Sequence, residues 1–531
     1  MVKQIVYIFL IVLFLSKPIL AATYYIDFVG GNDSDNGSIS DPWKHCPGDS
    51  NATGNPSSIS LVAGDTIIFK GGVQYDGMIT LYWSGSSDSE RITYDGNSAG
   101  TFGSGRGIID GGDTRQYGFI STSARSYLTI QNLEIRNIPY TTVGTTNPDG
   151  GIVIGDISTN CVGIKVLNCY IWDIAYWEPD GTNLQYGACV AINRMDNCLI
   201  DGNEFYKGSR WAVRMYGAKN TTVSNNNIHD YFQWAIDVSS AGWQQNTDNI
   251  IRDNTIHDIY QYDCKTTTLG AVDEGYWEGP SCTSPDNPHT DFIFLRDAGS
   301  ELPPLRTIVE RNLFYNDRDF ESHYDGTAMI YNSDTQDTVI RNNIFINPHS
   351  ARVIHDQDDS DGTKIYNNTF YGRTVSPGTV LYLEGTNVTL KNNIIVSSNY
   401  NLQFANTAII DACENNLFVP VTRVAYYNSS AYTTLSSWQS IGFDLLGDSV
   451  ASPSDVKFVS ISGFGANSSS MDLSLQSDSP AIGLGANLSA TFTDDYSGNT
   501  RSNWDAGAYE YQSGEQGHHG RSTGGSAGGM Q

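Results

Sequence analysis

The sequence predicts an all-β fold: a right-handed parallel β-helix, which is a solenoid with an N-terminal cap. An Asn-centred motif recurs along the chain, and a short segment of alternating apolar and polar residues precedes most of its copies. A period of roughly 20–30 residues indicates a solenoid, and alternation with period two indicates coils made of strands. The composition agrees, because 53 Gly, 31 Tyr and a charged fraction of 17% suit strands and turns better than helices.

The motif reads apolar, x, x, Asn, x, apolar, and its Asn residues lie 23, 28, 58, 31, 25, 25 and 23 positions apart. Coils stack about 4.8 Å apart, so each side-chain amide can hydrogen-bond the next one. We therefore expect one asparagine ladder, with Cys169 in the equivalent position one coil before it. The ladder residues are Asn203, Asn226, Asn254, Asn312, Asn343, Asn368, Asn393 and Asn416.

The first segment, residues 1–22, is typical of a signal peptide. Lys3 precedes an apolar run over residues 5–15, and the small residues Ala21 and Ala22 follow. The alternative is a membrane anchor, but the run is shorter than the roughly 20 apolar residues that span a bilayer. We expect a secreted, periplasmic or cell-surface protein without a membrane span after cleavage.

Four segments follow. Residues 23–115 should form the N-terminal cap and the first strands, because a solenoid needs its open end covered. Residues 116–420 carry the repeat and should form the parallel β-helix. Residues 421–511 should form C-terminal coils and a closing segment. Residues 512–531 are rich in Gly, Ser and His and are expected to be disordered.

The 58-residue interval between Asn254 and Asn312 holds either one coil with a long insertion or two irregular coils. The insertion, roughly residues 260–287, is the expected functional loop. Cys264 and Cys282 lie inside it and are candidates for a disulfide in an oxidising compartment. Buried free thiols are expected at Cys161, Cys169, Cys189 and Cys198.

The charge balance narrows the choice of partners. The chain has 30 Lys and Arg against 58 Asp and Glu, which gives a net charge of −28. Phosphate groups would be repelled, so general nucleic-acid binding and binding to anionic membranes are disfavoured. A monomer is expected.

Segments near both ends of the chain carry a family resemblance beside the coil repeat. They are Thr23-Tyr-Tyr-Ile-Asp27, Gly30-Gly-Asn-Asp33, residues 61–69, Asp472-Leu-Ser-Leu, Ser479-Pro-Ala-Ile and Ala506-Gly-Ala-Tyr-Glu510. With the repeat, they resemble secreted β-helix proteins of the pectate-lyase-like superfamily. The resemblance implies a polysaccharide substrate and activity as a lyase, hydrolase or epimerase. The chain has neither the Gly-His-Gly motif with paired aspartates of polygalacturonases nor the clustered calcium aspartates of typical pectate lyases, so the subfamily stays open.

Outward positions of the alternating strands define a candidate groove. Arg214 and Asp237 occupy the same column in consecutive coils. The arginine is expected to hold a sugar carboxylate or sulfate while Asp237 orients it, and the alternative is a surface salt bridge. The positions predicted to face outward are Arg214, Tyr216, Asp237, Arg296, Asn332, Arg352, Asp356 and Glu384.

A His-x-Asp sequence leads from the insertion into the strand that ends at Arg296. His289 could exchange a proton near neutral pH, and Asp291 could fix its tautomer. The alternative is a turn whose polar side chains bond the backbone. His323-Tyr-Asp325 repeats the pattern one coil later. His355 aligns with inward positions and is expected in the core.

Aromatic and acidic residues suggest two further features. Loop residues Trp177, Trp243 and Trp277 could form sugar platforms, whereas Trp211 and Trp234 should pack as an aromatic stack. An acidic turn with Asp356, Asp358 and Asp359, followed by Glu384 in the next coil, could bind Ca²⁺, the one cofactor expected. Its alternative is a solvated acidic turn.

The leading hypothesis is a lyase that cleaves a uronic-acid-containing glycan by β-elimination. Arg214 or Arg296 would neutralise the uronate, His289 would be the base, and Tyr216 or His323 would protonate the leaving oxygen. The insertion residue Lys265 is the next candidate base. One alternative is a hydrolase that pairs Asp237 with Asp291, and another is a noncatalytic glycan-binding or surface protein.

Overall fold

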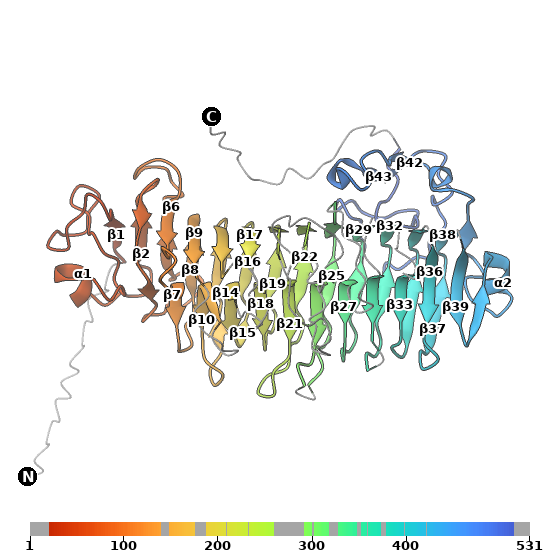
Figure 1. Cartoon of the computed structure of the whole chain (residues 1–531), viewed down its shortest axis with the longest axis horizontal. Coiled ribbons are helices and arrows are strands. Elements are labelled where there is room, and N and C mark those ends of the chain that lie inside the picture. The colour runs from red at the N-terminus through yellow and green to blue at the C-terminus, as the bar shows by residue number, and fades with distance from the viewer. Residues whose placement is uncertain are drawn as a thin grey trace, which may run out of the picture.

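The predicted parallel β-helix is confirmed. The computed structural model describes residues 21–139, 148–175, 187–208, 210–231, 233–259, 291–299, 302–317, 328–347, 352–357, 359–372, 379–397, 399–420 and 422–513. Within them, three sheets of 13 strands each run side by side along one long axis (Figure 1). Each coil contributes a strand to each sheet, so the sheets grow by one strand per turn of the chain.

The first sheet has parallel neighbours throughout. Its strands are β1 (Thr23–Ile26), β2 (Thr66–Phe69), β5 (Ile92–Asp95), β8 (Leu128–Gln131), β12 (Lys165–Leu167), β16 (Leu199–Asp201), β19 (Thr222–Ser224), β22 (Ile250–Arg252), β25 (Ile308–Glu310), β28 (Val339–Arg341), β31 (Lys364–Tyr366), β34 (Val388–Lys391) and β37 (Ile410–Glu414).

The second sheet is parallel up to its last strand, which pairs antiparallel. Its strands are β4 (Ile79–Thr80), β7 (Tyr117–Ser121), β10 (Asp149–Ile154), β14 (Gly187–Asn193), β18 (Trp211–Tyr216), β21 (Trp234–Ser239), β24 (Asp291–Arg296), β27 (Ala328–Asn332), β30 (Arg352–Asp356), β33 (Thr379–Leu383), β36 (Tyr400–Phe404), β39 (Arg423–Tyr427) and β40 (Ser430–Tyr432).

The third sheet completes each coil. Its strands are β3 (Gln74–Tyr75), β6 (Gly107–Asp110), β9 (Leu133–Ile138), β13 (Tyr170–Ile174), β17 (Glu204–Gly208), β20 (Asn227–His229), β23 (Thr255–His257), β26 (Leu313–Tyr315), β29 (Ile344–Asn347), β32 (Thr369–Gly372), β35 (Ile394–Ser397), β38 (Leu417–Val419) and β41 (Asp448–Ser449). The remaining elements are α1 (Gly54–Ser58), β11 (Cys161–Val162), β15 (Met195–Asp196), α2 (Leu435–Gln439), η1 (Pro453–Val456), β42 (Phe458–Ser460), η2 (Ser468–Ser470) and β43 (Asp472–Leu475).

The asparagine ladder is also confirmed. In each step the side-chain amide of one Asn donates to the side-chain oxygen of the next, at 2.9–3.1 Å. The ladder begins at Cys169, whose backbone N–H donates to Asn203, as the sequence predicted. It ends at Asp444, which accepts from Asn416 at 3.0 Å. These buried amides are all paired, so the ladder fixes one register for the coils.

The 58-residue interval is one coil with an insertion. β21 pairs directly with β24, β22 with β25 and β23 with β26, so no further coil lies between them. The inward side chains fill the core, where Phe314, Phe345 and Phe370 stack with ring centroids 4.7 and 4.9 Å apart. Four predicted free thiols lie buried in this core, and the two cysteines of the insertion lie outside the described residues.

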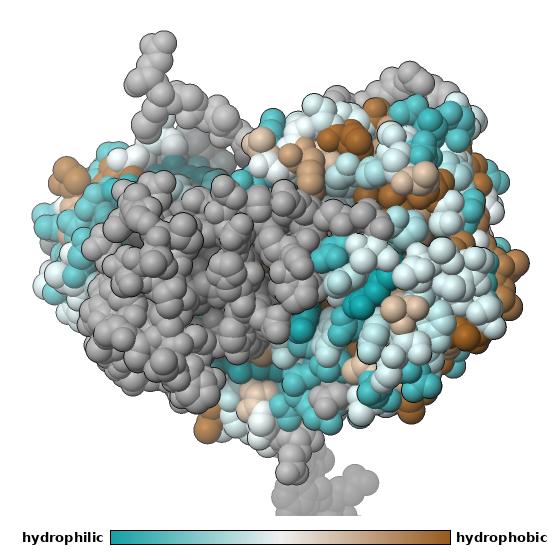
Figure 2. Space-filling model, turned by 45° about the vertical axis from the view of Figure 1, so that its right-hand side comes forward, coloured by the Kyte–Doolittle hydropathy of each residue, from teal (hydrophilic) through white to brown (hydrophobic). Residues whose placement is uncertain are grey.

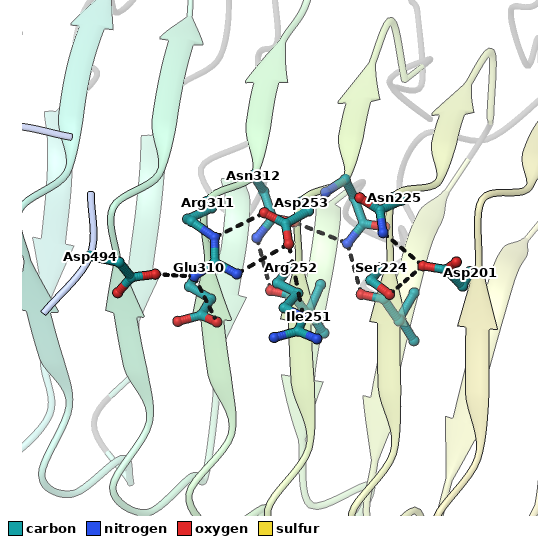
Figure 3. Close-up of polar contacts among 12 residues, drawn as sticks. Asp201, Ser224, Asn225, Ile251, Arg252, Asp253, Glu310, Arg311, Asn312 and Asp494 are labelled. Atoms are coloured by element: carbon teal, nitrogen blue, oxygen red, sulfur yellow. Dashed lines mark hydrogen bonds and ion pairs between the residues drawn. The ribbon is translucent and has the colours of Figure 1, made fainter. Parts of the chain in front are cut away.

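The chain after the last coil, residues 450–513, is here called the closing segment. Its strands β42 and β43 lie beside the C-terminal half of the solenoid (Figure 1), where Phe458 and Leu473 pack against outward residues of the third sheet such as Tyr371. Arg311 connects it to the coils: its guanidinium contacts Asp494, and its Nε lies 3.0 Å from Asp253 Oδ1 (Figure 3).

The first strands of the solenoid lie within residues 23–115, where β1 already belongs to the first sheet. No helix in the described part of the chain is both long and apolar enough to cross a membrane.

Candidate functional site

The outer face of the second sheet is where the sequence predicts a groove. Its strands place side chains in three columns, which together are called the outward strip. The first column is Trp211, Trp234, Asp291, Ala328, Arg352, Thr379, Tyr400 and Arg423. The second column is Arg214, Asp237, Phe294, Tyr331, His355, Tyr382, Gln403 and Tyr426. The third column includes Tyr216, Ser239 and Arg296.

Aromatic rings form a continuous row along this strip. Six rings from six consecutive coils contact one another in turn, with centroid distances between 4.5 and 6.3 Å. They belong to Trp211, Trp234, Phe294, Tyr331, His355 and Tyr382. Trp211 and Trp234 thus pack against each other as predicted, with their ring planes tilted by 39°. On the side of the molecule seen in Figure 2, by contrast, hydrophobic residues form small separate patches among polar ones.

Asp237 and Arg296 form the best-defined polar pair in the strip. Arg296 Nε lies 3.5 Å from Asp237 Oδ1 and donates to Ser239 Oγ at 3.0 Å. The Ser239 hydroxyl in turn donates to Asp237. Asp237 is fully buried, whereas the Arg296 side chain is 28% exposed and lies over the rings of Trp234 and Phe294. Arg296 can therefore reach a ligand while Asp237 keeps the arginine in position.

Arg214 is largely buried between the rings of its neighbours in the strip. It is 6% exposed and its guanidinium lies 4.8 Å from the ring centre of Trp211 and 4.3 Å from that of Tyr216. Burial lowers the pKa of Arg214 to about 10, against the opposing effect of the Asp237 charge, so it stays cationic at neutral pH. The predicted column with Asp237 is confirmed.

The expectation that His355 lies in the core is wrong. It belongs to the second outward column, between Tyr331 and Tyr382. Arg352 Nη1 lies 3.0 Å from His355 Nδ1, and His355 Nε2 lies 3.0 Å from Glu384 Oε2. Burial beneath its neighbours lowers the pKa of His355, although Glu384 acts in the opposite direction. This imidazole thus joins the strip with an arginine and a carboxylate as partners.

The outward placement of Asn332 and Asp356 is also wrong, and one slip explains all three errors. The predicted outward set assumes that Ala328 lies in line with Ala212, the residue after Trp211. In the structure Ala328 instead lies in line with Trp211 itself, through Trp234 and Asp291. A shift of one residue exchanges the faces of a strand.

Asp356 is consequently fully buried and accepts from Asn332 Nδ2 at 2.6 Å and from Thr363 Oγ1 at 2.8 Å. Burial raises its pKa to about 6. A calcium site at the acidic turn would have to be built without this carboxylate. Asp359 is exposed, and no group of three metal-binding side chains occurs in the part of the chain that the structure describes.

The two aspartates proposed for hydrolysis stand apart. Asp291 pairs with Trp234, three residues before Asp237 on the neighbouring strand. At about 3.3 Å per residue this offset is roughly 10 Å, beyond the roughly 5–9.5 Å that separates paired glycosidase carboxylates. Asp291 is also fully buried and accepts from the backbone N–H of Ala328 at 3.0 Å.

Trp243 lies near Tyr216, and its ring packs against other residues of the protein. The two ring centres are 5.1 Å apart, Arg194 lies 5.3 Å from the Trp243 ring centre, and Gly217 approaches the ring so closely that an added Cβ would be 2.6 Å from it. A sugar-platform role for Trp243 stays a prediction. The predicted residues that lie outside the described part of the chain are Trp177, Lys265, Trp277, His289, His323 and Asp358.

Sequence reasoning missed a second histidine cluster, on the outer face of the third sheet. His229 and His257 stack with ring centroids 4.8 Å apart, and their Nδ1 atoms lie 2.7 and 2.8 Å from Asp230 and Asp258. The signal is the repeated Ile-His-Asp, 28 residues apart. It also missed Arg210 and Arg423, whose signal is the recurrence of Arg and aromatic residues at the strand starts of the second sheet, and Tyr382, which lies within β33.

No family model matches, and no curated protein matches. Among solved structures, the chain is similar to a pectate lyase (14% identity, 92% of this chain and 96% of that one, TM-score 0.46). It is also similar to a lacto-N-biosidase from Eubacterium ramulus (15%, 66% and 64%, TM-score 0.42) and to a surface adhesin of Streptococcus pneumoniae (12%, 67% and 77%, TM-score 0.39). The chain spans 64% of the lacto-N-biosidase length.

Proposed function

We propose that this protein is an exported enzyme that cleaves a uronic-acid-containing polysaccharide by β-elimination. The observation that carries the proposal is the outward strip, where arginines lie over a row of contacting rings. Aromatic rings can stack on the apolar faces of sugars, and arginine binds carboxylates through its planar fork. Because the whole chain has a net charge of −28, a local set of arginines is needed to attract an acidic polymer.

β-Elimination needs three groups: a cation at the uronate carboxylate, a base near C5, and a proton donor for the leaving oxygen. Arg352 is the cation next to the described imidazole, and its guanidinium lies 4.1 Å from the ring centre of Tyr382. Arg296 supplies a second cation two coils earlier. Tyr382, whose ring contacts His355, is the proton donor nearest to the proposed base, whereas Tyr216 lies further along the strip.

His355 is the proposed base, and its hydrogen bonds assign its tautomer. Arginine has no acceptor, so the contact with Arg352 leaves the lone pair on His355 Nδ1 and the proton on Nε2, which donates to Glu384. The lowered pKa keeps this imidazole neutral at neutral pH. A uronate that draws Arg352 to its own carboxylate would free Nδ1 to accept the C5 proton. His289 remains the second candidate base.

The test compares His355→Ala with His289→Ala on a panel of uronate polymers, with product formation followed by the ultraviolet absorbance of the unsaturated sugar. If His355 is the base, His355→Ala lowers turnover about 10²–10⁴-fold, measured per folded molecule at a temperature where circular dichroism shows the variant folded. The same loss in His289→Ala alone would transfer the role to His289. New reducing ends without the absorbance would replace the lyase by a hydrolase, and binding without cleavage would favour a noncatalytic glycan-binding protein.

A further inference from the structure

We infer that the outward strip ends in a distal subsite, formed by Arg423, Tyr400 and Tyr426, that binds an acidic group of the polymer several sugars away from His355. The inference rests on the proposed function and deepens it, because it makes a long acidic chain, rather than a short oligosaccharide, the preferred substrate. The three residues lie on β36 and β39, the last two strands of the second sheet that pair in parallel.

Tyr400 and Tyr426 hold the Arg423 guanidinium in a defined position. It lies 3.8 Å from the ring centre of Tyr400 and 4.9 Å from that of Tyr426. Its Nη2 donates to Gln403 Oε1 at 3.0 Å, and Gln403 also accepts from Thr379 at 3.3 Å. These contacts are neutral, so they orient the guanidinium without cancelling its charge.

Arg423 differs in this respect from arginines on the other faces of the solenoid. Arg136 is paired with Asp110, Arg311 with Asp253 and Arg341 with Glu310. Arg423 forms no ion pair with any carboxylate among the described residues, and its Nε has no hydrogen-bond partner there. An uncompensated cation in so acidic a chain is available for an anionic ligand.

The register places Arg423 in line with the proposed catalytic cluster. Arg352 pairs with Thr379, Thr379 with Tyr400 and Tyr400 with Arg423, so three coils separate the two arginines. At about 4.8 Å per coil the distance along the strip is roughly 14 Å. Thr379 and Tyr400 in the first column, and Tyr382 and Gln403 in the second, lie between them and are uncharged. Glu384, the carboxylate of this interval, is bonded to His355.

Beyond Arg423 the strip stops, because β39 pairs with the antiparallel β40. The subsite therefore lies at one end of the groove. Contacts that a substrate makes far from the reacting bond can raise the rate of that step, and a chain too short to reach them gains nothing. Arg423 thus distinguishes long acidic chains from short ones.

The test uses the full-length protein with Arg423→Gln, Arg423→Lys and the control Arg306→Gln, which removes an exposed arginine, paired with Asp248, in the turn before β25 of the first sheet. The kcat/KM is measured on the polymer and on a short oligosaccharide of the same uronate. Arg423→Gln should lower kcat/KM on the polymer about 10-fold and leave the oligosaccharide unchanged. Arg423→Lys should lie between Arg423→Gln and wild type, and Arg306→Gln should match wild type.

Equal losses on both substrates, or no loss on the polymer, would overturn the subsite while leaving the proposed lyase intact. If the wild type cleaves none of the polymers, the proposed function fails, and calorimetric binding of the same polymers then decides the subsite. Weaker binding by Arg423→Gln supports it, and equal affinity overturns it. Should Arg423→Gln not fold, the comparison of Arg423→Lys with wild type carries the same decision.

Discussion

At the scale of single residues, the strip shows how burial and hydrogen bonding set the state of one imidazole. His355 is held between Arg352 and Glu384, one of which can only donate to it. Burial disfavours the charged ring, and Glu384 favours it, with the net result that the pKa lies below the usual value near 6.5. Protonation is therefore costly in the folded protein.

This arrangement predicts the pH dependence of activity. If His355 is the base, the acidic limb of kcat/KM falls at a pH below about 6.5. Glu384→Gln removes the group that raises the pKa, so the limb should shift to still lower pH. Glu414→Gln, at an exposed position on the first sheet, is the control. A limb that does not move in Glu384→Gln contradicts the assignment.

Stability has a related pH dependence. Because the folded pKa of His355 is lowered, its contribution is complete above about pH 6.5 and is lost as the pH falls from there towards the folded pKa. His355→Gln should flatten this part of the stability curve, measured by chemical denaturation across the window.

At the scale of elements, the asparagine ladder carries the register of the coils. Asn254 Oδ1 accepts from the backbone and the side chain of Asn226, and its amide donates to Asn312 and to the backbone of Val223. Asn254→Ala should lower the free energy of unfolding by roughly 1–3 kcal/mol, because buried partners lose their hydrogen bonds. Asn227→Ala, in an outward position of β20, should change it far less; similar losses in both variants would contradict the ladder's role.

The secondary-structure elements also show how much of the fold can be predicted from the sequence. The ladder and the single coil register around Asn203 to Asn416 followed from spacing alone, since each Asn repeats in one buried position. The strands of the second sheet carry adjacent inward residues, such as Ala212 with Val213, so strict alternation does not define their faces. The predicted register used Ala328 as its reference and was one residue out. The error exchanged the predicted inward and outward faces of His355 and Asp356. The closing segment has no repeat and its docking could not be read from the sequence.

At the scale of the whole molecule, the buried Arg501 is one of several contacts that attach the closing segment to the coils, beside Arg311–Asp494 and the packing of Phe458 and Leu473. Arg501 is 5% exposed and donates to Asn342 Oδ1 at 2.8 Å and to the backbone oxygens of Gly507 and Ala508 at 3.0 and 2.8 Å. Its Nη1 also lies 3.6 Å from the Glu510 carboxylate. Removal of the arginine would leave the buried oxygen acceptors without their donor and the buried Glu510 carboxylate without its cation.

Arg501→Ala should therefore release the closing segment while the coils persist. We expect faster proteolysis within residues 484–511 and a loss of several kcal/mol in the stability of that region. Arg306→Gln is again the control. Peptide mapping of the first cleavage sites distinguishes release of the closing segment from unfolding of the coils. First cuts inside the coils would contradict the prediction.

The asparagines that precede four ladder residues give this attachment an order in time. Asn342, Asn367, Asn392 and Asn415 reach outward to Arg501, Asp505, Ala486 and Leu484 of the closing segment. A ribosome makes those partners only after the coils themselves. Coils can therefore stack one after another as they are made. The asparagines at their turns find their partners only when the closing segment, the last part of the chain, has been made. A product of premature termination that lacks the closing segment would carry a formed solenoid whose turn asparagines have no partners there.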